Sequence, residues 1–319
     1  MQTIWNKLKR PFFVLAPMEN VTDTVFRRIV AICGKPDLFF TEFINTEGLC
    51  SEGYARIKRH LEFTDAERPI IVQIWGNKPE KFLEAAKIVA DMGFDGIDIN
   101  MGCPVRKVVS KGSCSALIRN PSLAREIILA TKEGAGGLPV SVKTRIGYKD
   151  IETEEWIGFL LEQPIEALTI HARTVKEMSK VPAHWEEIGR AVRLRNQMKK
   201  DVLIVGNGDV VSYRDGIEKC ERYGVDGVMV GRGIFNNLWI FRDIDPETIG
   251  HEEKLRLLIK HISMFDEFWG KYNHYDVMKK FFKVYISGFP NANAVRLELM
   301  ELKTAKEAIS YIESHLLNS

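Results

Sequence analysis

Eight short runs of apolar residues recur along most of the chain, separated by stretches with helical spacing of apolar positions. The runs are rich in Val, Ile and Phe and do not alternate apolar with polar residues, as is typical of parallel strands covered on both faces. They read FFVLAPM, LFFTEF, PIIVQIWG, GIDINMG, PVSVKTRIG, ALTIHAR, VLIVGNGD and GVMVGRG. Eight such strand and helix units over residues 11 to about 242 predict a (β/α)8 barrel, the TIM barrel.

The pattern changes near residue 248, where purely helical spacing begins. HEEKLRLLIKHISMFDEFWGKYN, HYDVMKKFFKVYISGF and NAVRLELMELKTAKEAISYIESHLL carry charges on one side of an apolar stripe. The sequence therefore predicts two domains, a barrel over residues 1–242 and a small all-helical domain over residues 248–319.

Composition limits the surroundings in which we expect the chain to work. The 45 Lys and Arg residues nearly balance the 43 Asp and Glu residues, so net charge alone indicates no nucleic-acid partner. The five cysteines form no Cys-x-x-Cys pair, and the start of the chain lacks a signal-peptide pattern, which favours a reducing cytoplasm. No apolar run approaches the roughly 18 residues of a membrane span. We expect a cytoplasmic monomer without a metal site.

Polar residues follow the apolar part of nearly every predicted strand. In a barrel of this kind the carboxyl ends of the strands surround one mouth, where active sites are built. Because loops are polar anyway, a single such residue indicates little, but seven positions together favour a site. Six of the positions hold polar residues, namely Gln73, Asn100, Lys143 with Arg145, His171 with Arg173, Asn207 with Asp209, and Arg232, and the position after the first strand is Met18.

Glycine-rich turns follow the seventh and eighth strands, in GNGDV and GRG. In this fold those two loops often hold a phosphate on backbone N–H groups. A glycine lets the backbone approach the phosphate oxygens, and Arg232 can add charge-assisted hydrogen bonds. Tight turns are the alternative reading, but the position of both turns favours a phosphate.

Lys143 ends an otherwise apolar strand, where an ammonium group is costly to bury without a partner. A reduced flavin is anionic on its pyrimidine side and would be such a partner, and the Gln73 amide can hydrogen-bond the same ring edge. The alternative is that Lys143 forms a structural ion pair. The glycine-rich turns at the same mouth favour the ligand over this alternative.

The loops after the fourth and fifth strands are strongly basic. Residues 104–149 contain nine Lys and Arg residues against two Glu residues. A flavin phosphate accounts for one or two of these charges, and a nucleic-acid backbone would account for the rest. Arg125 and Lys132 are also consistent with the solvated face of an outer helix.

Cys103 differs from the cysteines at 33, 50 and 220, which fall within apolar spacing and are typical of a packed core. It follows a strand, between Gly102 and Pro104, and basic residues come next. An exposed thiol in a positive field suits proton transfer or nucleophilic attack. Cys114, in the same basic loop, is the alternative reactive thiol.

Taken together, APMENVTDTVFR, TEF, VQIWG, IDINMGCPVRKVVSKGSCSALI, VKTRIG, IHART, GNGDV and GRG closely resemble the tRNA-dihydrouridine synthases, and YISGFPNANAVRLELM resembles their helical C-terminal domain. The resemblance implies an FMN enzyme that uses NADPH to reduce the 5,6 double bond of a uridine in tRNA, with the helical domain binding RNA. Cys103 would be the catalytic acid. The residues implied to bind FMN are Pro17, Met18, Glu19, Gln73, Lys143, His171, Asn207, Gly208, Asp209, Gly231 and Arg232. Those implied to bind substrate are Asn100, Lys107, Arg145 and Arg173.

The segment VKEMSKVPAHW departs from the family pattern at Ser179, Val181 and His184, which leaves another structured RNA open as the substrate. Two other functions stay open at this point. One is an FMN barrel acting on a free small molecule, such as a dihydroorotate dehydrogenase, and the other is a non-catalytic RNA-binding protein. The basic loops and the helical segment disfavour the first, and Gln73, Cys103 and Lys143 disfavour the second.

Overall fold

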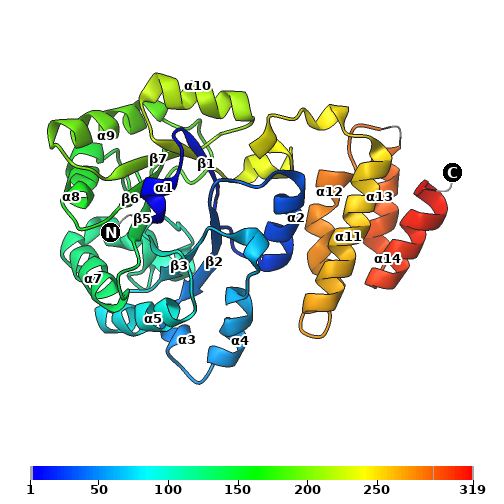
Figure 1. Cartoon of the computed structure of the whole chain (residues 1–319), viewed down its shortest axis with the longest axis horizontal. Coiled ribbons are helices and arrows are strands. Elements are labelled where there is room, and N and C mark those ends of the chain that lie inside the picture. The colour runs from blue at the N-terminus through cyan, green and yellow to red at the C-terminus, as the bar shows by residue number, and fades with distance from the viewer. Residues whose placement is uncertain (1–2, 290, 318–319) are drawn as a thin grey trace. The chain divides into compact units, whose positions relative to one another are not determined.

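The computed structural model describes residues 3–289 and 291–317. Its strands form one parallel sheet in the order β1-β8-β7-β6-β5-β4-β3-β2, and a parallel bridge between Val14 and Leu38 closes it. The predicted (β/α)8 barrel is therefore confirmed (Figure 1). The strands are β1 (Phe12–Leu15), β2 (Phe39–Asn45), β3 (Ile70–Trp75), β4 (Gly96–Asn100), β5 (Val140–Arg145), β6 (Ala167–His171), β7 (Leu203–Asn207) and β8 (Gly227–Val230).

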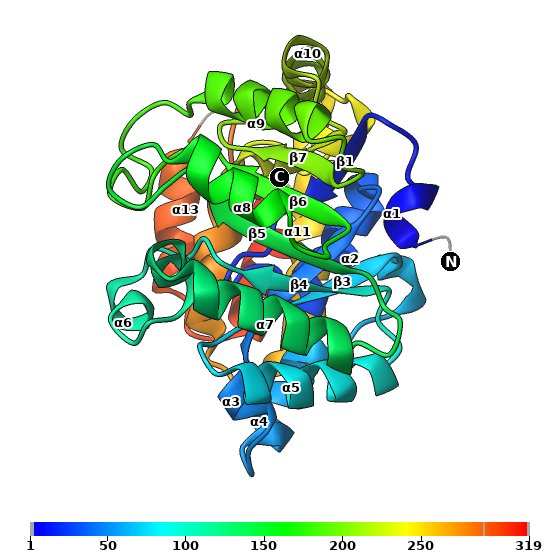
Figure 2. The ribbon, with the colours of Figure 1, turned by 90° about the vertical axis from the view of Figure 1, so that its left-hand side faces the viewer.

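Amphipathic helices cover the outer face of the barrel (Figure 2). Local sequence sets their ends: the Asn120 side chain caps the N-terminus of α7, and Gly224, in a left-handed conformation with φ of 71°, ends α10. The long helices are α5 (Pro79–Asp91), α7 (Pro121–Gly134), α9 (Trp185–Gln197) and α10 (Tyr213–Tyr223). Short ones are α1 (Ile4–Lys7), α3 (Thr46–Leu49), α4 (Tyr54–Lys58), α6 (Arg106–Val109) and α8 (Gly158–Leu161), the last preceded by a π-helical turn (Thr153–Ile157).

The barrel interior is filled with side chains and is not a channel. Trp5 of α1 lies in the apolar core cluster, with its ring centroid 6.0 Å from that of Phe12 and 6.4 Å from that of Phe40. Strand residues complete this layer: Val14, Ile71, Ala167, Leu203, Val205 and Met229. Because the core is apolar, the polar side chains of the strands are left to gather near the carboxyl ends.

By its contacts the chain divides into two compact units. The first comprises residues 1–24 and 36–231, and the second comprises residues 25–35 and 232–319. These bounds differ from the expected domains, 1–242 and 248–319, because helix α2 (Thr24–Gly34) and the segment after β8 cluster with the C-terminal helices. A catalytic role for one unit and an RNA-binding role for the other stay predictions.

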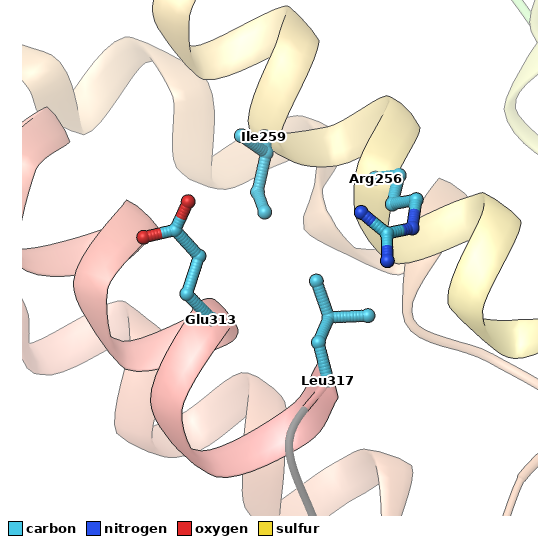
Figure 3. Close-up of a pocket in the computed structure, with 4 residues that line it drawn as sticks. All are labelled: Arg256, Ile259, Glu313 and Leu317. Carbon is cyan, nitrogen blue, oxygen red and sulfur yellow. The ribbon is translucent and has the colours of Figure 1, made fainter.

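The second unit is helical, as expected for the C-terminal part of the chain. Buried His261 accepts or donates a 2.8 Å hydrogen bond with the Tyr285 hydroxyl and packs on Phe26 and Phe281. A pocket lies between α11 and the C-terminal π-helical turn (Glu313–Leu317), lined by Arg256, Ile259, Glu313 and Leu317 (Figure 3). The helices of this unit are α2, α11 (His251–Trp269), α12 (Phe282–Tyr285), α13 (Ala292–Glu301) and α14 (Ala305–Ile312).

Candidate active site

Strand register brings several of the predicted site residues together at the carboxyl ends of β3, β4 and β5. Gln73 pairs with Asp98 across β3 and β4, and Asn100 pairs with Lys143 across β4 and β5. Side chains two residues apart on a strand point to the same face, so Asp98 and Asn100 share a face. A layer of polar side chains thus lies directly above the apolar core.

A continuous chain of hydrogen bonds runs through this layer. The Gln73 Nε2 donates to Asp98 Oδ2 at 2.6 Å, and the Asn100 Nδ2 donates to Gln73 Oε1 at 2.9 Å. Asn100 Oδ1 then accepts from the backbone N–H groups of Gly102 and Cys103, at 3.0 and 2.9 Å. Asn100, predicted to lie near the substrate, therefore also fixes the backbone of the predicted acid.

Lys143 lies beside this chain, half-buried, and its Nζ donates to Asn207 Oδ1 at 3.1 Å. Burial lowers the pKa of the Lys143 ammonium to about 8, helped by the positive charge of Arg145 and opposed by Asp98. Asp98 is fully buried, and this burial raises the pKa of its carboxyl to about 6 against the hydrogen bonds from Ser141 and Gln73. Because the pKa values of Lys143 and Asp98 lie close to neutral pH, a charged ligand placed beside either group would change the fraction of that group that is ionised.

Cys103 lies in the loop between β4 and α6, and its thiol is partly accessible. A hydrogen bond from the Cys114 thiol, opposed by burial and helped by the Val105 backbone and Arg145, lowers the pKa of Cys103 to about 6. The same contact and burial raise the pKa of Cys114 well above its usual value. Of the two thiols in the basic loop, Cys103 is therefore the more acidic and accessible, and Cys114 is its buried hydrogen-bond donor.

Arg145 joins two loops of the mouth, a role the sequence did not predict. Its Nε donates to the Gly102 carbonyl at 2.7 Å, and its Nη1 donates to the carbonyls of Thr174 and Met178 at 3.0 and 2.9 Å. The side chain is 5% exposed. The loop that carries Cys103 and the loop after β6 are consequently held by one guanidinium, while the predicted contact of Arg145 with substrate stays a prediction.

A second polar cluster lies at the ends of β6 and β7. Arg173 is buried, and its Nη2 donates to Asp209 Oδ2 at 2.5 Å while its Nε donates to the Val181 carbonyl at 2.6 Å. Its Nη1 lies 3.1 Å from His171 Nε2. Gly208, with φ of 128°, makes the turn that places Asp209 here, and the Trp185 indole donates to its carbonyl at 2.8 Å.

The remaining predicted residues lie around the ends of β1 and β8 or on α6. Pro17 is buried and Met18 packs partly on the core cluster, whereas Glu19 is exposed. Gly231 ends the first unit, and a Cβ at this position would make only an ordinary van der Waals contact with Ala16, at 3.9 Å. Arg232 is exposed and belongs to the second unit, and its predicted contact with the flavin phosphate stays a prediction.

The basic loops divide into paired and exposed cations. Lys132 forms an ion pair with Glu166, as the outer-helix interpretation allowed. Arg119 lies over the Tyr148 ring, with its guanidinium carbon 4.0 Å from the ring centroid. Exposed cations lie on short helix α6 and just after it: Arg106, Lys107 and Lys111. A polyanion could reach these three, as well as exposed Lys149 at the end of the basic segment.

Sequence reasoning missed Asp98 and the pair formed by Glu42 and His60. Glu42 is buried and lies 2.9 Å from His60 Nδ1, which raises the pKa of His60. A usable signal existed for Asp98: an acid alone in the apolar strand GIDIN is as costly to bury as Lys143, the residue that this argument did identify. Nothing comparable marked His60, which lies 18 residues from its partner.

Within residues 3–289 and 291–317, no group of three or more His, Cys, Asp or Glu side chains is arranged to hold a metal ion. In that same part of the chain, no helix is both long and apolar enough to cross a membrane.

The closed parallel barrel with a polar mouth defines a fold shared with several solved enzymes. Histamine dehydrogenase from Rhizobium superposes with a TM-score of 0.56 at 14% identity, covering 79% of this chain and 48% of that one. Morphinone reductase in complex with tetrahydroNAD gives a TM-score of 0.50 at 12% identity, covering 74% and 89%. At these identities the likeness concerns the fold alone.

Sequence comparison is far more specific. The family described as Dihydrouridine synthase (Dus) matches residues 14–319. Probable tRNA-dihydrouridine synthases from Staphylococcus epidermidis and, under the name probable tRNA-dihydrouridine synthase 2, from Bacillus subtilis are each 46% identical, covering 98% of this chain and 96% of theirs. The chain belongs to the dihydrouridine synthase family, as the resemblance of its motifs predicted.

Proposed function

We propose that this chain reduces the 5,6 double bond of uridines in tRNA, with FMN bound at the barrel mouth, NADPH as reductant and Cys103 as the proton donor. The observation that carries the proposal is the placement of Cys103: Asn100, at the end of β4, holds its backbone beside Lys143 and Gln73. A titratable thiol and a cation thus lie at one mouth, with the buried Gln73 amide beside them. The relatives' printed activity supports tRNA as the substrate.

The residues present fit FMN. Lys143 and Gln73 supply the cation and amide donor that the pyrimidine edge of the ring needs, and Asn207 orients Lys143 by accepting its hydrogen bond. Gly208 and Gly231 would let the backbone approach a phosphate, and Pro17, Met18, Glu19, His171 and Asp209 belong to the same unit. The part of Arg232 in binding the phosphate stays a prediction. Reduced FMN, when bound, supplies the hydride for carbon 6 of the uracil.

Cys103 gives the proton that carbon 5 needs after hydride arrives at carbon 6. Without a ligand its pKa of about 6 favours the thiolate, which cannot donate. A base seated over the thiol removes water from it, and desolvation raises a thiol pKa. Binding of the target nucleotide therefore returns the proton to the group that must deliver it.

The rest of the mouth binds and orients the RNA. A uracil reaches the site only when its nucleotide is turned out of the stack, which requires a grip on the flanking backbone. Exposed Lys107 supplies charge for phosphates, while Asn100 lies at the base-binding position. Buried Arg145 and Arg173 shape the loops that surround the nucleotide, and their direct contact with RNA, the monomeric state and the cytoplasmic location stay predictions.

The decisive test begins with the absorbance spectrum of the purified protein reconstituted with FMN. NADPH oxidation is then measured with three substrates: unmodified tRNA, unmodified ribosomal RNA and free uridine. Mass spectrometry of the digested RNA would quantify dihydrouridine. We expect flavin absorbance and dihydrouridine in tRNA. Absence of bound flavin would contradict the proposal, and product in ribosomal RNA alone would change the substrate without changing the chemistry.

A further inference from the structure

We propose that Asp98 is a positioning residue whose carboxylate fixes the direction of the hydrogen-bond chain that ends on the backbone of Cys103. We call this chain of Asp98, Gln73 and Asn100 the amide chain. Its geometry does not depend on the proposed function. Its consequence for proton delivery does, because that consequence requires Cys103 to be the acid.

The direction of the amide chain can reverse because the side chains of Gln73 and Asn100 each carry a donor, the NH2 group, and an acceptor, the amide oxygen. The two groups have nearly the same shape, so hydrogen-bond partners decide which way each amide faces. A carboxylate can only accept, so Gln73 must turn its Nε2 toward Asp98 and its Oε1 toward Asn100. Asn100 must then turn its Nδ2 toward Gln73.

The far end of the amide chain requires the same direction. The backbone N–H groups of Gly102 and Cys103 can only donate, so Asn100 must present Oδ1 to them. With an acceptor fixed at one end and donors fixed at the other, neither amide can rotate without losing hydrogen bonds in a buried layer. Each unmet buried group costs about 1–3 kcal/mol. Asp98 and the two backbone donors thus require the same single orientation of both amides, and this orientation holds the backbone of Cys103.

The environment of Asp98 favours this role over simple packing. The side chain is fully buried, and its second oxygen accepts a 2.6 Å hydrogen bond from the Ser141 hydroxyl. Nearby Lys143 favours the charged form of Asp98, against the burial that raises its pKa. A buried charge is expensive and an apolar residue would be a cheaper filler of this space. What a charge supplies here, and a neutral residue does not, is a partner that accepts on both oxygens.

The test compares Asp98→Asn with the double variant Asp98→Asn/Gln73→Glu. In the single variant the new amide can donate as well as accept, so the acceptor at this end is no longer fixed and the direction depends on the N–H groups of Gly102 and Cys103 alone. In the double variant the Glu accepts from both neighbours, which restores the acceptor that Asn100 requires. Ser141→Ala is the matched control, because it removes a hydrogen bond to Asp98 without altering the direction of the amide chain.

The readout is the rate of alkylation of Cys103 by iodoacetamide against pH, resolved by mass spectrometry from the other cysteines. It needs neither flavin nor RNA, so it stays informative if the proposed function fails. We expect Asp98→Asn to slow alkylation near pH 6 about three- to tenfold, because a displaced thiol loses the contacts that lower its pKa. The double variant should return to within about twofold of the parent rate, as should Ser141→Ala.

An unchanged alkylation profile in folded Asp98→Asn would overturn the proposal, as would a folded double variant that reacts as slowly as the single one. The double variant retains one carboxylate in the layer, so it tests the proposal by itself if the single variant does not fold. If alkylation behaves as expected, Asp98→Asn should also slow RNA-dependent reoxidation of the enzyme. Normal reoxidation would then contradict the role of Cys103 and leave the amide chain intact.

Discussion

The barrel mouth holds two polar clusters that are stabilised in different ways. The amide chain of β3 and β4 is buried and contains one carboxylate and two neutral amides, so its hydrogen bonds set which way each amide faces. The cluster of β6 and β7 contains an ion pair between Arg173 and Asp209, which we call the arginine pair. Its opposite charges neutralise each other. The amide chain is sensitive to which atom donates, whereas the arginine pair is sensitive to charge.

Arg145 connects the two regions through backbone carbonyls alone. It binds Gly102 on the side of the amide chain, and Thr174 and Met178 on the side of the arginine pair. A guanidinium suits this position because its planar fork reaches several acceptors at fixed angles. We therefore predict that substitutions in the amide chain change the reactivity of Cys103 more strongly than substitutions in the arginine pair.

The largest effect is expected from Cys103→Ala, at the end of the amide chain. Loss of a positioned general acid typically slows a reaction about 10²- to 10⁴-fold. Reduction of the flavin by NADPH should continue, because it uses no proton from the uracil side, while reoxidation by tRNA should slow. Stopped-flow absorbance separates the two halves. Dihydrouridine formation that survives in Cys103→Ala and is lost in Cys114→Ala would assign the acid to the buried thiol instead.

Lys143→Met should slow reduction of the flavin while raising the stability of the protein. Loss of an interaction made in the transition state typically costs about 2–4 kcal/mol, so reduction of the flavin should slow strongly. The flavin-free variant should nevertheless be more stable than the parent at pH 7. Burial lowers the pKa of Lys143 to about 8, so the unfolded chain binds its proton more tightly and the parent gains stability only as pH rises from about 8 toward 10.5.

The stability gain of Lys143→Met should be about 1–3 kcal/mol at pH 7, since water reaching the half-buried ammonium weakens the penalty. It should shrink above pH 8. Denaturant unfolding at several pH values measures it, and Lys87→Met on the exposed face of α5 is the control. A gain that does not depend on pH would show that the ammonium is not the cause.

Arg145→Lys tests the connection between the two regions. A lysine reaches one carbonyl well, so contacts to two of the three carbonyls should be lost, at about 2–4 kcal/mol in total. Hydrogen exchange should increase in residues 174–184 and in the loop of Cys103 together. The control is Arg125→Lys, which is exposed on α7 and should change neither. Faster exchange in one loop alone would mean that the loops are held independently.

The sequence was sufficient to predict the barrel, because eight apolar runs without alternating polar residues fit few other folds. It also identified most residues of the mouth, since polar residues at the ends of buried strands converge in this fold. It could not reveal which of them contact one another. The resemblance implied that Arg145 binds substrate, which stays a prediction, and nothing in the sequence indicated its hydrogen bonds to carbonyls 29 to 43 residues away.

Asp98 was missed for a related reason. Period two along GIDIN places Asp98 and Asn100 on one face, but the hydrogen bond from Gln73 depends on the register of two strands whose paired residues lie 25 positions apart. The boundary between the units was equally hidden. Helix α2 reads as an ordinary crossover of the barrel, and only its three-dimensional contacts assign residues 25–35 to the helical unit.

The smallest effect is expected from Asp209→Asn, in the arginine pair. The new amide keeps the shape and can still accept from Arg173 and from the Ala183 N–H, which lies 3.0 Å from Asp209 Oδ2. What is lost is the charge. Because Asp209 is 39% exposed, solvent already screens the pair, and we expect a cost of about 1 kcal/mol, decreasing as salt is added. Thermal unfolding at low and high salt measures it, with Glu84→Gln in the exposed pair with Lys81 as a control that should not change. If Cys103 alkylation slows as much in Asp209→Asn as in Asp98→Asn, charge and direction act on the thiol equally, and the distinction between the two clusters does not hold.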